Sequence, residues 1–99
     1  MILVRDVFQI KYGRMKEAKS LWKEMMSGPQ QDPQRPKPRL LTDLTGQYYT
    51  MVVESIFNDL ADYESSMRQM MSASRRDAAY EKFIPLVDSG RREIFTIVE

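Results

Sequence analysis

The sequence predicts one α+β domain whose elements follow the order βαββαβ. Three observations support this prediction. Stretches rich in β-branched and aromatic residues stand near both ends of the chain, and two internal segments repeat apolar residues at helical spacing. Between those segments lie two further apolar stretches, divided by one glycine. With 99 residues, 42% hydrophobic and 29% charged, the chain has the size and composition of a single globular domain, residues 1–99.

The first strand and the first helix follow from a change of period. Residues 2–11 form the predicted strand, which stops at Tyr12-Gly13. In the next segment, residues 14–26, Lys and Glu fill one side of a helical wheel. The other side of the wheel is apolar: Met15, Ala18, Leu21, Trp22, Met25 and Met26. The helix is expected to end at Gly28-Pro29, because Gly suits the position past the last turn and Pro cannot continue it.

A proline-rich loop and a β-hairpin follow. Residues 28–38 (GPQQDPQRPKP) carry four prolines and no large apolar side chain, so we expect an extended surface loop that folding does not require. The stretches 39–45 and 47–57 then form two strands that turn at Gly46.

The second half of the chain supplies another helix, a shorter one and the last strand. Asn58 is the expected N-cap of the second helix, whose apolar stripe is Leu60, Tyr63, Met67, Met70 and Met71. A short helix is expected to begin at Ser74, where the sequence resembles a capping box, and to end at Pro85, which cannot continue a helix. Residues 88–90 are predicted to turn the chain into a final strand, 91–98.

The strands predict a homodimer. In a βαββαβ fold with right-handed crossovers, both long helices cover one face of a four-stranded antiparallel sheet. The third strand is nevertheless apolar on both sides, since Met51 and Val53 alternate with Val52 and Ile56. An uncovered apolar face of this size is rarely tolerated by a monomer. We therefore expect the sheet to pack against the sheet of a second copy.

Three stretches of the chain carry a resemblance to a known superfamily: PRLLTDLTG (38–46), YYTMVVE (48–54) and GRREIFTIVE (90–99). They resemble small members of the dimeric α+β barrel superfamily, above all NIPSNAP-like proteins and the antibiotic-biosynthesis-monooxygenase group. The resemblance implies a ferredoxin-like monomer whose sheet joins a partner's sheet. Some members are cofactor-free oxygenases, others are isomerases or dehalogenating enzymes, some degrade haem with a His ligand, and many have no assigned activity.

Composition excludes several classes of function. The chain has no His and no Cys, so the usual ligands of haem and transition metals are missing and we expect no cofactor. A net charge of +1 gives no field that favours nucleic acid, and Gln47 stands where an RNA-recognition motif would need a basic residue. The sequence contains no apolar run long enough to cross a membrane and no signal-peptide pattern, so a cytoplasmic protein is expected.

Asp6 is the candidate catalytic residue. It shares a side of the first strand with Val4 and Phe8, the more uniformly apolar side. A carboxylate buried under the helices would have a raised pKa, which suits a general base. The alternative is a structural role in which Asp6 meets an Arg or a hydroxyl group. Arg5 and Glu54 are expected on the opposite face, where they could form an ion-pair network between two sheets.

Trp22, Tyr63 and Tyr80 are the candidate residues for a ligand pocket between helices and sheet, although aromatic residues at helical spacing also serve simply as core. We therefore expect a homodimer that handles a small organic molecule, with cofactor-free oxygenation or isomerisation of an acidic phenol or carbonyl compound as its activity. The alternative is a non-catalytic binding or structural module. A continuous cavity that reaches Asp6 would favour the first function, and a packed interior would favour the second.

Overall fold

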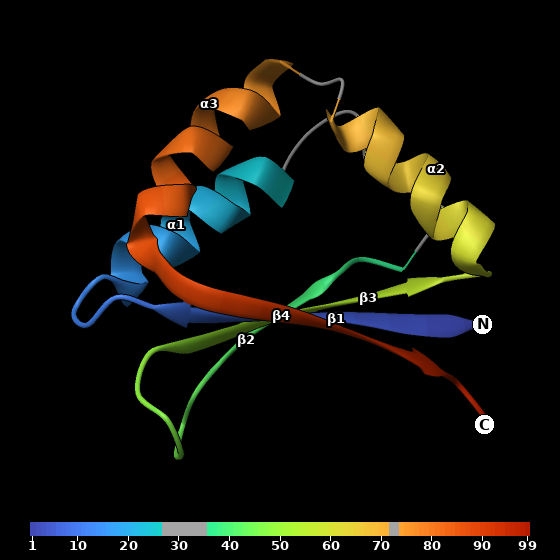
Figure 1. The fold of residues 1–99 in the computed structure, drawn as a ribbon, viewed down its shortest axis with the longest axis horizontal. Helices are drawn as coiled ribbons and strands as arrows, with labels where there is room; N and C mark the ends of the chain where they lie inside the picture. The colour runs from blue at the N-terminus through green and yellow to red at the C-terminus, as the bar shows by residue number, and fades with distance from the viewer. Residues whose placement is uncertain (27–35, 72–73) are drawn as a thin grey trace.

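A computed structural model describes residues 1–26, 36–71 and 74–99, and within them the strands and helices follow the predicted order. The strands are β1 (Ile2–Ile10), β2 (Arg39–Thr42), β3 (Thr50–Phe57) and β4 (Val87–Thr96). The helices are α1 (Met15–Met26), α2 (Leu60–Met71) and α3 (Ser74–Phe83), and the 3-10 helix η1 (Ile84–Leu86) leads into β4. The sheet is antiparallel with the order β2-β3-β1-β4, and the helices lie together on one of its faces (Figure 1). This confirms the predicted ferredoxin-like α+β fold.

The register of β1 decides which side chains share a face. Asp6 lies opposite Val53 of β3 and opposite Arg92 of β4. Phe8 contacts Trp22 of α1, with 5.6 Å between ring centroids, so the side of β1 that carries Asp6 faces the helices. The residues of β1 on this helix side are Ile2, Val4, Asp6, Phe8 and Ile10. The other residues, Leu3, Arg5, Val7 and Gln9, point to the face that no helix covers, which we call the open face.

The core lies between the sheet and the helices α1 and α3. Ile10, Met51 and Phe83 are almost wholly buried there, together with Ala18 near the start of α1. Ala at this position lets α1 pack close to the sheet, because its small side chain adds almost no bulk between the helix and the sheet. Helix α2 covers the other end of the sheet, beyond the end of β3 (Figure 1).

The hairpin and the last strand differ from the prediction. β2 and β3 are joined by residues 43–49 rather than by a tight turn at Gly46, because Tyr49 adopts a left-handed conformation (φ 58°) that ends the pairing early. Residues 88–90, expected to form a turn, belong to β4 instead. Gly90 lies opposite Phe8, and a Cβ at Gly90 would come within 3.4 Å of the Phe8 ring, so the aromatic side chain covers the glycine.

Two further expectations concern the ends of segments. The N-cap of α2 is Asp59 and not Asn58: the Asp59 Oδ1 accepts a hydrogen bond of 2.8 Å from the backbone N–H of Asp62. In return, the Asp62 carboxylate accepts a hydrogen bond of 2.9 Å from the backbone N–H of Asn58.

The proline-rich segment 28–38 lies outside the described residues as far as residue 35. Within the described part of the chain, no helix has the length and apolarity needed to cross a membrane.

Candidate functional site

The Asp6 carboxylate on the helix side of the sheet is paired with Arg92. The Nε–H of Arg92 donates to Asp6 Oδ1 at 2.5 Å, and the Arg92 and Asp6 side chains are 52% and 21% exposed. Neighbouring strands bring them together, since Arg92 lies directly across from Asp6 in the β1–β4 register. The structure therefore contains the ion pair that was the structural alternative for Asp6. Sequence reasoning did not single out Arg92, because the pairing of two residues 86 positions apart was unknown.

Tyr63 of α2 stands beside this pair. The guanidinium carbon of Arg92 lies 5.6 Å from the centre of the Tyr63 ring, which also packs against Phe57 at 5.2 Å between centroids. Burial raises the pKa of Tyr63; Arg92 opposes this rise and Asp6 adds to it, so the phenol stays protonated to higher pH than usual. Burial alone would lower the pKa of Arg92, but its hydrogen bond to Asp6, the Asp6 charge and Tyr63 together raise it.

Trp22 lies next along the same face. Its ring packs against Phe8, two residues from Asp6 on β1, and against Phe83 of α3 at 5.3 Å between centroids. The indole N–H of Trp22 and the hydroxyl of Tyr63 are both buried, and neither donates a hydrogen bond to any described residue. Buried donors without an acceptor are rare in folded proteins and are expensive to desolvate.

The third pocket candidate, Tyr80, is less closely associated with the site. It lies on α3, where its neighbour Ala79 is buried, while the Tyr80 side chain itself is partly exposed. The structure thus places Tyr63 beside the Asp6–Arg92 pair, and it places Trp22 on the same side of the sheet, against Phe8.

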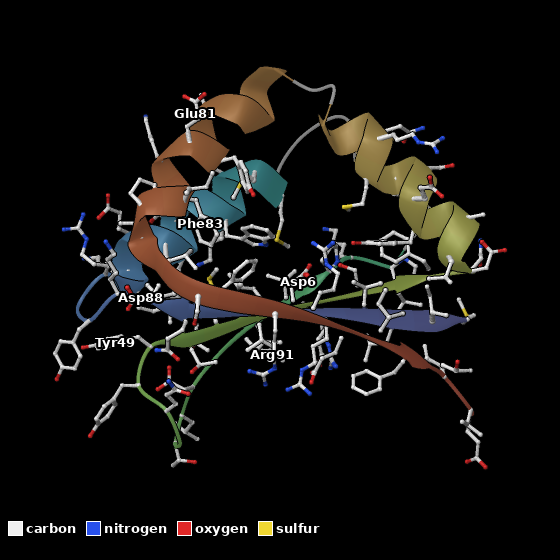
Figure 2. The ribbon with its side chains drawn as sticks, viewed as in Figure 1. Asp6, Tyr49, Glu81, Phe83, Asp88 and Arg91 are labelled. Atoms are coloured by element: carbon white, nitrogen blue, oxygen red, sulfur yellow. The ribbon has the colours of Figure 1, made fainter. Side chains whose placement is uncertain are left out.

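The open face carries the second set of candidates. Glu54 accepts a hydrogen bond of 2.6 Å from Arg39 and lies 3.7 Å from the Nε of Arg5, so Arg5 and Glu54 interact within one chain. Figure 2 shows Asp6 on the helix side of the sheet and Arg91 on the opposite side, although Arg91 is adjacent in sequence to the partner of Asp6. Alternate residues of a strand point to opposite faces, which explains this separation.

A hollow of about 470 Å³ lies on the open face. It is lined by the loop of the β2–β3 hairpin and by strand residues that include Arg5, Val7, Val52 and Arg91. Its lining contains neither Asp6 nor any of the three aromatic candidates, so this hollow is not the cavity that would decide between catalysis and packing.

The helix-side residues form a set with defined chemistry. We call Asp6, Arg92, Tyr63 and Trp22 the helix-side cluster. It combines one carboxylate, which can accept a proton, with a permanent positive charge and two neutral donors. Such a set suits the binding of an oxygen that becomes negatively charged. The described residues contain no group of three or more His, Cys, Asp or Glu side chains that could hold a metal ion.

Comparisons with known proteins bear on the fold. No family model and no curated protein matches the sequence. Among solved structures, a NIPSNAP domain protein from Burkholderia xenovorans superposes with a TM-score of 0.82 at 12% identity, over 99% of this chain and 95% of that one. A putative antibiotic biosynthesis monooxygenase from Nitrosomonas europaea gives 0.79 at 8% identity over the whole of both chains.

A variant of SnoaB, a cofactor-independent oxygenase from Streptomyces nogalater, also has this architecture. It superposes with a TM-score of 0.71 at 13% identity, over 99% of this chain and 93% of that one. Identities this low establish the architecture and not the chemistry. The chain therefore has the fold shared by NIPSNAP and antibiotic-biosynthesis-monooxygenase proteins, as the resemblance of its sequence predicted.

Proposed function

We propose that this protein binds a small, weakly acidic organic molecule, a phenol or an enolisable carbonyl compound, at the helix-side cluster. We further propose that it converts this molecule without a cofactor, by oxygenation or isomerisation, and that it acts as a homodimer. The observation that supports the proposal best is the pair of buried donors, the Trp22 indole N–H and the Tyr63 hydroxyl, that lack an acceptor within the described residues. An oxyanion of a bound ligand would supply the missing acceptor.

The charges of the cluster suit a ligand that becomes an anion as Asp6 takes up its proton, because the positive charge of Arg92 is then no longer balanced by Asp6. Arg92 stays protonated at any physiological pH, and the raised pKa of Tyr63 keeps its phenol a donor rather than an anion. Both groups therefore stabilise a phenolate or enolate more than its neutral parent. This preference for the charged form lowers the free energy of deprotonation, which is the first step of both reactions.

Asp6 is the proton acceptor in this proposal. Its hydrogen bond with Arg92 uses one carboxylate oxygen, Oδ1, and the side chain remains partly accessible. A carboxylate held by a neighbouring guanidinium keeps a fixed orientation, which a general base needs. The carbanion left after proton transfer would add molecular oxygen to form a peroxide anion, which takes the proton back from Asp6 and then loses water to leave a carbonyl group at that carbon. In an isomerisation the anion would instead take the proton back at another carbon. That SnoaB is a cofactor-independent oxygenase on this architecture supports the first route.

Binding can be tested with 4-nitrophenol, because the visible absorbance of its phenolate reports ionisation directly. We expect saturable binding, and we expect the bound probe to ionise at lower pH than the free probe. Tyr63→Phe and Trp22→Phe each remove one donor to the anion and should weaken binding roughly tenfold or more. Arg92→Gln should also remove most of the shift in ionisation.

Arg91→Gln is the matched control for Arg92→Gln. The two residues are adjacent on β4, yet Arg91 lines the open-face hollow and Arg92 contacts Asp6. The control should bind the probe like the unmodified chain. Equal losses in both variants, or no saturable binding at all, would refute the proposed site.

Catalysis needs a separate measurement. Oxygen uptake with a panel of polycyclic phenols and anthrones should show turnover that Asp6→Asn abolishes while probe binding persists. Binding without turnover or isomerisation of any compound in the panel would instead support the alternative, a non-catalytic binding module. In that case the Asp6–Arg92 pair would serve only to position the ligand.

A further inference from the structure

Four charged side chains form a single row across the open face, one from each strand. Arg39 pairs with Glu54 in the β2–β3 register, Glu54 with Arg5 in the β3–β1 register, and Arg5 with Glu93 in the β1–β4 register. Across the sheet from β2 to β4, the signs are positive, negative, positive and negative. We call these four residues the charged row.

Interactions within one chain leave the middle of the charged row incompletely satisfied. Glu54 is only 11% exposed and sits between Arg39 at 2.6 Å and Arg5 at 3.7 Å. The Nε–H of Arg5 is buried, and no described residue accepts a hydrogen bond from it. A buried guanidinium N–H without an acceptor is unfavourable, so we expect a group outside this chain to accept its hydrogen bond.

The rows on either side of the charged row are largely apolar. On one side, Leu41, Val52 and Val7 lie next to each other on β2, β3 and β1, and Arg91 of β4, opposite Val7, ends the row. On the other side, Phe95 of β4 is exposed and lies opposite Leu3. A face with apolar rows around a central charged row has the make-up of an interface core.

We propose that a second copy of this chain docks on the open face with its two-fold axis parallel to the strands, above the line between β1 and β3. This arrangement rests on the homodimer proposed above and specifies how the copies meet. A two-fold axis in that direction reverses the order of the strands in the partner. Reversing a row of four alternating charges exchanges every sign, so each charge meets its opposite. Arg39 then faces the partner's Glu93, and Arg5 faces the partner's Glu54.

The other aligned packing of two such sheets places the axis across the strands. Each residue of the charged row would then face its own copy, Arg against Arg and Glu against Glu. Like charges facing each other in an interface are strongly unfavourable, so the charged row selects against this arrangement. In the selected arrangement, Arg5 and Glu54 lie nearest the axis, and with their copies they form a closed ring of alternating charges. The partner's Glu54 is the acceptor for the Arg5 Nε–H.

Charge reversal tests the register. Arg39 and Glu93 belong to opposite edge strands, so they cannot compensate each other within one chain. We expect Arg39→Glu and Glu93→Arg each to raise the dimer dissociation constant roughly tenfold, and the double variant to return close to the original value. Lys16→Glu, on the exposed side of α1, makes the same change of charge as Arg39→Glu and should leave dimerisation unchanged.

Sedimentation equilibrium measures these dissociation constants, and its outcomes distinguish a wrong dimer from a wrong register. If the unmodified chain is a monomer, the homodimer itself is refuted, and the register with it. If it is a dimer but the single variants dissociate no more readily, or the double variant is weaker than either, the dimer stands and the register is wrong. Thermal unfolding of each variant controls for destabilisation of the monomer itself, because reversal at Arg39 also places a carboxylate beside Glu54.

Cross-linking tests the same register with gentler substitutions. The chain has no Cys, so each introduced thiol is unique. Packed sheets lie about 10 Å apart, a distance that a short bis-maleimide spans. An equal mixture of Arg39→Cys and Glu93→Cys chains should give cross-linked heterodimers, while either variant alone should give few. Efficient linkage of Arg39→Cys to itself would indicate the self-facing arrangement and overturn the proposal.

Discussion

Phe83 joins the core to the helix-side cluster, which makes Phe83→Ala an informative perturbation. The Phe83 side chain is 1% exposed, and its ring lies 5.3 Å from both Phe8 and Trp22, measured between centroids. Loss of a buried Phe side chain removes its burial and leaves a cavity, which together cost about 3–5 kcal/mol. We expect a loss of about 4 kcal/mol here, because Phe8 and Trp22 are held from two separate elements and cannot both collapse into the space.

Denaturant unfolding at fixed protein concentration measures this loss. Trp22 is the single tryptophan, so its fluorescence reports on the cluster while circular dichroism reports on the helices. The emission of folded Phe83→Ala should also move to longer wavelength, since the indole loses an aromatic neighbour. The control is Ile84→Ala at the next position, where the side chain is 51% exposed, with an expected loss below about 1 kcal/mol. Equal losses in the two variants, or a loss below about 2 kcal/mol for Phe83→Ala, would refute this account of the core.

Three further predictions concern pH, capping and the proline-rich segment. Because the folded chain raises the pKa of Tyr63, its contribution to stability is complete below about pH 10, the ordinary value, and is lost as pH rises through the folded pKa. In urea titrations over that alkaline interval, Tyr63→Phe should therefore lose less stability than the unmodified chain; parallel curves of stability against pH for the two chains would contradict this. Asp59→Ala should cost about 1 kcal/mol by removing the cap of α2, and Asn58→Ala clearly less, by the same measurement. Replacing residues 30–36 with a Gly/Ser linker should shift the melting temperature by only a few degrees, because closure entropy changes slowly with loop length; loss of folding would show that the segment is required.

Local patterns predict the order of elements well because each element has its own period. The apolar stripe of residues 14–26 and the β-branched run at the N-terminus both agree with the structure to within a residue. The prediction for residues 88–90 is wrong, since Asp, Ser and Gly favour turns locally whereas pairing with β1 extends them into β4. The predicted hairpin is also too tight, because nothing in the sequence indicates that Tyr49 adopts a positive φ.

The candidate site depends on long-range register, which one sequence does not contain. Alternation places Asp6 on the same side of its strand as Val4 and Phe8, but it does not say which face the helices cover or whether Arg91 or Arg92 is the partner of Asp6. A slip of one residue in the β1–β4 pairing would exchange these two arginines between the faces. The same holds for the charged row: alternation predicts Arg5 and Glu54 on one face, and only the pairing of all four strands brings Glu93 into line with them.

The sheet order leaves β4 at one edge, and this has a consequence for the solubility of the chain. A ten-residue strand with no neighbour on its outer side among the described residues is a template for unwanted pairing with other chains. Three consecutive charged residues, Arg91, Arg92 and Glu93, occupy the middle of β4, so a foreign strand that added there would have to desolvate charge on both of its faces. Variants that neutralise these three residues should therefore be tested for aggregation by light scattering and for fibril formation. The same charged side chains that distinguish the two faces of the sheet also oppose the pairing of β4 with other chains.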